Sequence, residues 1–242
     1  MNVLKKLSVT IGDERVVMTF GHPDTEAELK EVFRLRHAVY AKYGYLNPDH
    51  FPEPTESDMY DANGQCVYFA AMIGERAIGF VRLVRPPLPI HKAYTFETPK
   101  ELDGIEVCEL GRLVVDRYSD GVHTPRNIIL LFLTLCLAEY CEQNGIHYAY
   151  AFLKKKLMGK LKTLGMPFTL ITPFTLEYRK DGPMAPYFYN DDDPAEPSYF
   201  TLETVNDFLE KTIKSLFTEV EPNHYELQTT LYTRFLKTIG VI

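Results

Sequence analysis

The sequence contains no tryptophan, only four cysteines, and fewer basic than acidic residues. The cysteines (Cys66, Cys108, Cys136 and Cys141) are scattered, and no pair has the spacing of a redox motif or of zinc ligands. We therefore expect reduced thiols, as in a cytoplasmic protein, and no metal site. A net charge of -7, with 26 basic and 33 acidic side chains, argues against a general nucleic-acid-binding protein.

Long hydrophobic runs are absent as well. The longest apolar run, residues 128–138, is well short of the roughly 20 residues that a bilayer-spanning helix needs. Residues 1–10 carry two lysines but lack the apolar core and small-residue cleavage site of a signal peptide. We therefore expect a protein that does not span a membrane.

The length and composition predict an ordinary globular chain. With 242 residues, of which 45% are hydrophobic and 24% charged, the chain can bury a sizeable core. We expect one domain over residues 1–180, followed by a C-terminal loop and helical extension over residues 181–242 that packs on it.

The stretch 105–115 is predicted to be a buried strand, because it is apolar apart from a few positions. Strand alternation puts Glu109 on one face and Arg112 on the other. A carboxylate in an apolar strand is costly unless it is paired or hydrogen-bonded. Gly111 is typical of a bulge or of a place where a ligand approaches the backbone. On this stretch alone, a structural ion pair at a sheet edge and a functional site are equally favoured.

The order of the elements predicts an α/β fold with a mixed sheet flanked by helices. Glycines, prolines and capping residues punctuate these elements. The expected strands cover 16–20, 67–73, 77–84, 105–115, 147–152 and 168–171, and the expected helices 25–40, 127–143, 156–164, 202–217 and 225–239, with irregular loops over 44–61 and after 173.

Two arginines lie on faces that should be buried. Arg36 falls in the apolar stripe of the first helix with Val32 and Val39, and Arg82 shares a strand face with Phe80 and Val84. Each side chain could extend to water along its aliphatic stem, or it could meet a carboxylate in the interior. The acidic cluster at 56–61, taken alone, is typical of a solvated loop.

Several motifs, in this order, resemble the acyl-homoserine lactone (autoinducer) synthases and the related N-acyl amino acid synthases, which share the GNAT acyltransferase fold. The resemblance covers about residues 30–171 and implies a GNAT-like mixed sheet and acyl transfer. The motifs are the residues at 33–37, Glu56, Asp58, Tyr60 and Asp61, Tyr68-Phe69, the residues at 79–83, and Glu109-Leu110-Gly111-Arg112.

The resemblance also implies roles for individual residues, in one charge network of Arg36, Asp58, Asp61, Arg82, Glu109 and Arg112. Glu109 would be the general base for the acceptor amine, with Arg82 and Asp61 in the catalytic group. Arg36, Asp58 and Arg112 would bind the substrate and balance charge, although the opposite strand face favours a structural or donor-side role for Arg112. Backbone amides of Leu113, Val114 and Val115 would stabilise the oxyanion.

The sequence departs from the family pattern in ways that bear on the acceptor. Tyr43 and Tyr45 stand where autoinducer synthases commonly carry tryptophan, a proline-rich insertion covers residues 47–54, and the extension past residue 173 has no counterpart in the resemblance. These departures favour transfer of a fatty acyl chain to the amine of an amino acid. The alternatives are an acyl-homoserine lactone synthase that uses S-adenosylmethionine, and a non-catalytic module that binds a lipid or a partner.

The donor is expected to be an acyl-phosphopantetheine on acyl carrier protein, with acyl-CoA as the alternative and no permanently bound cofactor. The stretch 117–126 has one glycine, Gly121, whereas a GNAT pyrophosphate loop is glycine-rich and offers amides at a helix start. A basic run would dock the acidic carrier, although a solvated helix face is the commoner meaning of such a run. Its residues are Lys154, Lys155, Lys156 and Lys160.

Overall fold

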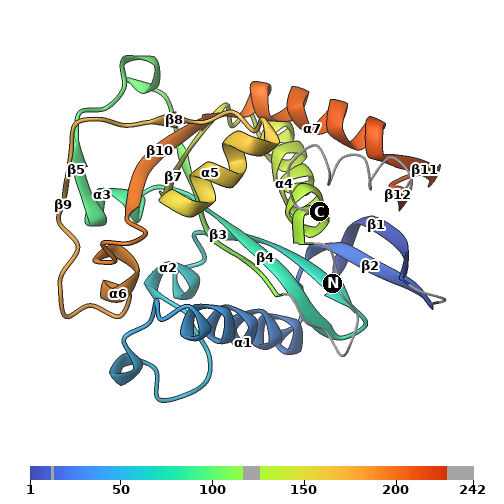
Figure 1. Cartoon of the computed structure of the whole chain (residues 1–242), viewed down its shortest axis with the longest axis horizontal. Coiled ribbons are helices and arrows are strands. Elements are labelled where there is room, and N and C mark those ends of the chain that lie inside the picture. The colour runs from blue at the N-terminus through green and yellow to red at the C-terminus, as the bar shows by residue number, and fades with distance from the viewer. Residues whose placement is uncertain (12–13, 117–125, 228–242) are drawn as a thin grey trace.

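A computed structural model describes residues 1–11, 14–116 and 126–227, and one mixed ten-stranded sheet runs through it (Figure 1). Neighbouring strands are antiparallel except for β1 with β12 and β6 with β7. The expected α/β mixed sheet is confirmed. In spatial order the strands are β11 (Phe217–Glu221), β12 (His224–Leu227), β1 (Asn2–Ile11), β2 (Glu14–His22), β3 (Cys66–Ile73), β4 (Arg76–Val84), β6 (Cys108–Val115), β7 (Tyr148–Lys154), β10 (Ala195–Thr201) and β8 (Thr169–Leu170).

Helices cover both faces of this sheet, so that two hydrophobic clusters form, one on each side. One face carries α4 (Arg126–Gln143) and α7 (Leu202–Leu216), with α5 (Lys155–Leu164) directly after β7. The other face carries α1 (Glu26–Lys42). Short elements complete this side: α2 (Met59–Ala62), α3 (Ile90–Ala93), α6 (Ala185–Phe188), the 3₁₀ turns Pro48–His50 and Lys100–Leu102, and a small sheet of β5 (Tyr94–Phe96) and β9 (Phe174–Leu176).

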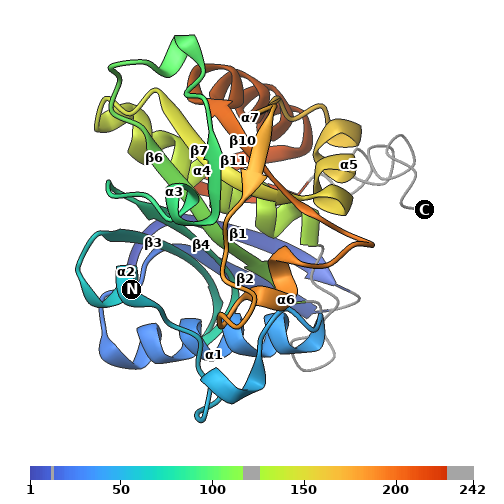
Figure 2. The same cartoon turned by 90° about the vertical axis from the view of Figure 1, so that its left-hand side faces the viewer.

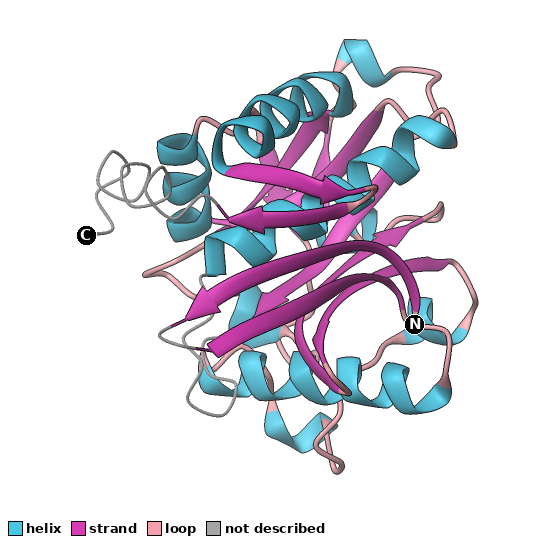
Figure 3. Cartoon of the chain, turned by 90° about the vertical axis from the view of Figure 1, so that its right-hand side faces the viewer, coloured by secondary structure: helices cyan, strands magenta, loops and turns pink. Residues whose placement is uncertain are grey.

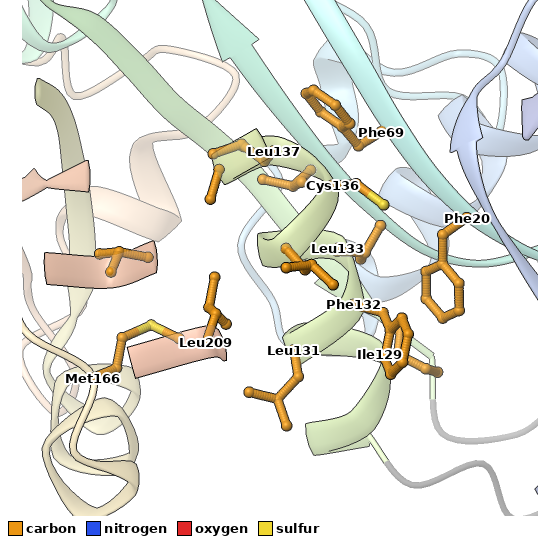
Figure 4. Packing of buried hydrophobic residues seen from close by; sticks show 14 of the residues in the cluster. Phe20, Phe69, Ile129, Leu131, Phe132, Leu133, Cys136, Leu137, Met166 and Leu209 are labelled. Atoms are coloured by element: carbon orange, nitrogen blue, oxygen red, sulfur yellow. The ribbon is translucent and has the colours of Figure 1, made fainter. Parts of the chain in front are cut away.

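The apolar helix α4 is the centre of the larger cluster (Figure 4). Phe132 stacks on Phe20 of β2 with ring centroids 5.1 Å apart. A Cβ on Gly79 of β4 would lie 2.5 Å from the side chain of Ile129, so this glycine lets the helix lie directly on the strand. None of the helices in the described ranges is long and apolar enough to cross a bilayer.

Helix α1 begins at a capping box, and one of its charged side chains, Arg36, points into the protein. The Thr25 side chain accepts from the backbone of Glu28, and the Glu28 side chain accepts in turn from the backbone of Thr25. Arg36 is completely buried on this helix, between Val32 and Tyr40. The prediction that Arg36 lies on the buried face is confirmed, and the snorkelling alternative is wrong.

Strand β6 contains a bulge that changes which residues share a face. Phe80 of β4 pairs with Val114 and Arg82 pairs with Gly111, so one residue of β4 lies opposite two of β6. Arg112 takes the left-handed conformation, with φ of 58°. The extra residue shifts the alternation by one, which turns Arg112 to the α1 side of the sheet, where Glu109 also lies. The expectation that Arg112 lies on the opposite face from Glu109 is therefore wrong.

The C-terminal part contributes more strand than expected. The polar loop after residue 173 contains β10, which pairs with β7 over its whole length. Residues 225–227 belong to strand β12 rather than to the expected helix 225–239, whose remainder lies outside the described residues. The helix expected over 202–217 is confirmed as α7. The division at residue 180 stays a prediction, although β10 and β12 join the same sheet as residues 1–180.

The N-terminal residues form a strand that was not anticipated. Strand β1 pairs with β2 along nearly its full length and with β12 on its other edge. Figure 3 shows these long, strongly curved strands at the end of the sheet remote from β7.

Candidate active site

Six buried or partly buried side chains from four segments form a closed ring of ion pairs. Arg36 donates from Nε to Oε2 of Glu56 at 2.6 Å and from Nη1 to Oδ2 of Asp61 at 3.0 Å. Arg82 of β4 donates to Oδ1 of Asp61 at 2.8 Å. Arg36 and Arg82 therefore share the carboxylate of Asp61.

The remaining contacts close the ring. Arg82 donates to both oxygens of Asp58 at 2.8 Å, a bidentate pair. Arg112 donates to Oδ2 of Asp58 at 2.9 Å and to Oε1 of Glu56 at 3.2 Å. Each arginine thus bridges two carboxylates, and each carboxylate bridges two arginines. We call this set the charge ring: Arg36, Arg82, Arg112, Glu56, Asp58 and Asp61.

Local backbone structure holds the acidic members in place. Asp58 caps the short helix α2 by accepting from the amides of Tyr60 at 2.9 Å and Asp61 at 3.3 Å. The Asp61 carboxylate accepts in return from the Asp58 amide at 2.8 Å, which completes a capping box. The Glu56 amide donates to the carbonyl of Phe33 on α1. The acidic cluster is therefore part of the interior, and the solvated-loop interpretation is wrong.

The ring stabilises the charged forms of Asp58 and Arg82 although burial opposes them. Burial alone would raise the pKa of Asp58, but Arg112 and Arg82 hold it below its ordinary value. Burial alone would lower the pKa of Arg82, but its hydrogen bonds to Asp58 hold it above its ordinary value. The Arg36 guanidinium also lies 5.2 Å from the ring centroid of Phe33, which adds a cation–π contact.

Three positive and three negative charges cancel within the ring. The geometry therefore supports the predicted role in charge balance, while a role of Arg36, Asp58 or Arg112 in binding substrate stays a prediction. Glu56 was missing from the predicted network, although it accepts from two of the arginines. Its place two residues before Asp58 in the acidic cluster is the signal that could have indicated it.

Glu109 lies beside the charge ring without belonging to it. Its Oε2 accepts from the amide of Ile90, at the start of α3, at 2.6 Å. Within the described residues it forms no ion pair, so its predicted part in the network is limited to the electrostatic influence of Arg82, Arg112 and Asp58. Burial raises the pKa of Glu109 to about 8, against a smaller lowering by the Ile90 amide, Arg82 and Arg112. A carboxylate with this pKa is matched to taking a proton from an amine near neutral pH.

A cavity of about 420 Å³ passes between β6 and β7. The two parallel strands pair only at Cys108 with Ala149 and at Glu109 with Tyr150, and they lie side by side in Figure 2. Beyond these pairs, both strands line the cavity instead of bonding to each other. The wall begins at Tyr40, Gly111 and Arg112 on the α1 side, includes Leu113, Val114 and Val115, and continues to Leu130 of α4, Leu161 of α5 and Val205 of α7. The cavity therefore crosses the sheet.

Lys154, expected to dock a carrier, is buried at the end of β7. It donates to the carbonyls of Asp193 at 2.6 Å and of Tyr187, and its ammonium lies 4.8 Å from the ring centroid of Tyr45. Burial lowers its pKa to about 8. A surface-docking role for Lys154 is therefore wrong, because these contacts and its burial remove it from solvent.

The other three lysines of the run, Lys155, Lys156 and Lys160, are exposed on α5. The Asp193 carboxylate accepts from the amide of Lys156 at 2.8 Å, which places a negative charge at the positive end of this helix. The stretch at 117–125, considered above for the donor, lies outside the described residues.

The model of one protein family, N-acyl amino acid synthase FeeM, matches residues 31–159, just over half of the chain. This chain belongs to the FeeM family of N-acyl amino acid synthases. The match contains all of the charge ring, Glu109 and both strands that border the cavity. The resemblance inferred from the motifs is confirmed, and the protein is an acyltransferase. A search of curated proteins finds no match.

Solved structures of related enzymes share the fold. A CoA-dependent acyl-homoserine lactone synthase, BjaI, is 21% identical over 78% of this chain and 83% of its own, with a TM-score of 0.52. The acyl-homoserine lactone synthase LasI is 18% identical over 76% and 89%, with a TM-score of 0.56. FeeM itself, from uncultured soil microbes, is 16% identical over 77% and 90%, with a TM-score of 0.54.

Loss of one member of the charge ring should lower the free energy of unfolding strongly. Replacing Arg36 by Met should lower the free energy of unfolding by roughly 3–5 kcal/mol, because Glu56 and Asp61 are left buried without one of their partners. Urea denaturation measures this change. Arg34→Met is the matched control, since Arg34 lies on the same helix, half exposed, and pairs with Glu31. The control should lose less than about 1 kcal/mol. Equal losses in both variants would contradict a ring that acts as a unit.

Glu109 should make stability depend on pH. Its pKa is about 8 in the folded protein against an ordinary value of 4.5, so between these values the folded state binds more protons than the unfolded state. Stability should therefore fall as pH rises through this window, by roughly 1.4 kcal/mol per pH unit. Glu109→Gln lacks this contribution. The difference in free energy of unfolding between the two proteins should change with pH from 5 to 8, and a constant difference would refute the raised pKa.

Proposed function

We propose that this acyltransferase moves a fatty acyl chain from the thioester of acyl carrier protein to the amine of an amino acid, in the cytoplasm. The observation that carries the proposal is the cavity between β6 and β7, which joins the strand of Glu109 to an apolar space beneath α4, α5 and α7. A thioester held between the strands has its acyl chain on one side of the sheet and its reacting carbonyl near Glu109 on the other.

The cavity suits a long acyl chain. Beyond the strands its wall is mostly aliphatic, with Leu130, Leu137, Leu161 and Val205 among its members. A volume of about 420 Å³ is within the range of pockets that bury drug-sized ligands. An acetyl group would leave nearly all of this apolar surface without a partner, which favours a fatty acyl donor.

The bulge on β6 supports the step at the carbonyl. Leu113, Val114 and Val115 line the cavity where β6 no longer pairs with β7. Amides on this side of the strand are placed to donate to the oxyanion that forms when the thioester is attacked. The expected role of these three residues in substrate binding is thus part of the proposal.

Glu109 supplies the base. The acceptor nitrogen attacks the thioester carbon, the N–C bond forms, and Glu109 takes the proton that the nitrogen releases. The C–S bond then breaks, and the thiolate of the phosphopantetheine arm takes this proton from Glu109 and leaves as a thiol, which restores the Glu109 carboxylate. Arg82 and Asp61 act through the charge ring, which holds the neighbouring strand and helix in place around Glu109.

Two alternatives share the same cavity. Free acyl-CoA is the donor in the first alternative, as in the CoA-dependent synthase BjaI, and S-adenosylmethionine is the acceptor in the second. Release of methylthioadenosine during acyl transfer would identify the second alternative. Mass spectrometry of lipid extracts from cells that express the protein distinguishes an N-acyl amino acid from an acyl-homoserine lactone.

Glu109→Gln should reduce turnover by roughly 10²–10⁴-fold, the loss expected when a general base is removed. The substitution keeps the shape and the hydrogen bond from Ile90, so the protein should fold and bind the acyl carrier normally. Steady-state kinetics with a fixed acyl donor measure the loss. Turnover within a few-fold of the wild-type value would remove Glu109 from the role of base.

Carrier docking predicts a preference that depends on charge. The exposed lysines of α5 should attract an acidic carrier, so the ratio of kcat/KM for carrier-bound to CoA-bound acyl group should exceed one and shrink as salt rises. The variant Lys155→Glu/Lys156→Glu/Lys160→Glu should remove most of this preference.

The matched control is Lys30→Glu/Lys100→Glu/Lys211→Glu, which makes the same change in net charge at exposed positions on other elements. It should leave the carrier preference nearly unchanged. A preference for CoA that neither triple variant alters would show that the basic run is only a solvated helix face.

A further inference from the structure

The two oxygens of the Glu109 carboxylate have different surroundings. Oε2 accepts the amide of Ile90 at 2.6 Å, whereas Oε1 accepts no hydrogen bond from the residues that the structure describes. The Oε1 atom faces Gly111: a Cβ placed on this glycine would lie 3.7 Å from it, with no other heavy atom outside the neighbouring residues within 4 Å. The oxygen that is free to take a proton therefore borders an open space above Gly111.

The same glycine borders the cavity between β6 and β7. Gly111 is one of the residues that line it, directly before the bulge at Arg112. The backbone of Gly111 does not have a positive φ, so its conformation is open to residues with side chains. The backbone conformation therefore does not require a glycine at this position. What the glycine provides is room beside Oε1 of Glu109.

Tyr60 and Arg82 each have a buried polar atom without a hydrogen-bond partner among the described residues. Gly111 pairs across the strands with Arg82, and the Arg82 guanidinium lies 5.9 Å from the ring centroid of Tyr60. The Tyr60 hydroxyl and Nε of Arg82 are both buried and have no hydrogen-bond partner among the described residues. Burial raises the pKa of Tyr60 to about 12, and the charge of Glu109 adds to the rise, which agrees with the two side chains being near each other.

Both unpartnered groups are donors. The Tyr60 hydroxyl and the guanidinium N–H each lack an acceptor, and a buried polar group without a partner costs free energy. A carboxylate is an acceptor that could satisfy such a donor. The free Oε1 of Glu109 could in turn accept from an amine. An amine and a carboxylate a short distance apart are the two groups that every α-amino acid carries.

We propose that Glu109 Oε1, the open space at Gly111 and the Tyr60 hydroxyl form the acceptor subsite for an α-amino acid. The amine donates to Oε1, the carboxylate accepts from Tyr60, and the substituent on the α-carbon occupies the space above Gly111. Gly111 and Tyr60 are then the residues that determine which acceptor is used. This inference rests on the proposed function and names the subsite where its acceptor binds.

Gly111→Ala and Gly111→Ser test the space. With one acyl donor held constant, kcat/KM is measured for glycine, alanine and tyrosine as acceptors. An added Cβ should lower kcat/KM for the larger acceptors by 10-fold or more relative to glycine, the usual effect of one carbon in a pocket. The KM for the donor should stay within about two-fold. Gly159→Ala is the matched control, because Gly159 is exposed on α5 and its added Cβ meets nothing.

Tyr60→Phe tests the carboxylate contact. It should raise KM for an amino acid by about 10-fold, the loss of one hydrogen bond to a charged group. The decarboxylated analogue, such as tyramine for tyrosine, should be unaffected, whether measured as a substrate or as a competitive inhibitor. Tyr189→Phe is the control, since its hydroxyl donates to the backbone of Tyr178 away from Glu109. Melting temperatures of all variants show whether the fold is retained.

The outcomes separate this inference from the proposed function. If the wild type acylates amino acids and Glu109→Gln abolishes the reaction, but Gly111→Ala and Tyr60→Phe leave the ranking of acceptors unchanged, the subsite is wrong and the function stands. If the wild type transfers an acyl group to no amino acid from either donor, both are wrong. A ranking that changes at Gly111 and a loss at Tyr60 confined to acceptors with a carboxylate support the subsite.

Discussion

The closed ring of three arginines and three carboxylates is the constraint on which the rest of the site depends. A buried charge is tolerated only when its partners satisfy it, and here each member has two partners of opposite sign. The ring joins α1, the capping box of α2, β4 and β6, elements that are far apart in the sequence. Satisfying six charges at once leaves little freedom in how these elements meet, so the ring determines the geometry around the cavity.

The bulge on β6 is the place where the ring and the chemistry meet. It turns Arg112 toward Glu56 and Asp58, which completes the ring and cancels its charge. Glu109, three residues earlier, is left without an arginine of its own. A direct ion pair would lower its pKa and make it a weak base, whereas burial beside a neutral ring raises that pKa to about 8. The neutrality of the ring is thus what allows a carboxylate beside Arg82, Arg112 and Asp58 to have a pKa high enough to take a proton from an amine.

The sequence was informative where a residue broke a local pattern. Arg36 and Arg82 stood out on apolar faces, and both are buried in ion pairs. The sequence was misleading where the orientation or burial of a side chain depends on one inserted residue or on a partner far away in the chain. Strict alternation cannot show the bulge that moves Arg112 to the other face, because the bulge exists only in the pairing with β4. The burial of Lys154 likewise depends on Tyr187 and Asp193, which return to β7 only when β10 adds to its edge.

The same strand therefore carries the proposed base, the proposed acceptor space, the bulge and part of the cavity wall within seven residues, 109–115. This arrangement is possible because β6 pairs with β7 only up to Glu109, whereas on its other edge it pairs with β4 on both sides of the bulge, up to Val115. The bonded edge is anchored to β4, the strand that carries Arg82 of the ring, while the free edge faces the cavity. Substitution of a charged residue of the ring should therefore shift Glu109, the space at Gly111, the bulge and the cavity wall together. A change at Glu109 or Gly111 alters one feature and leaves the others in place, so the two kinds of variant separate support of the site from its chemistry.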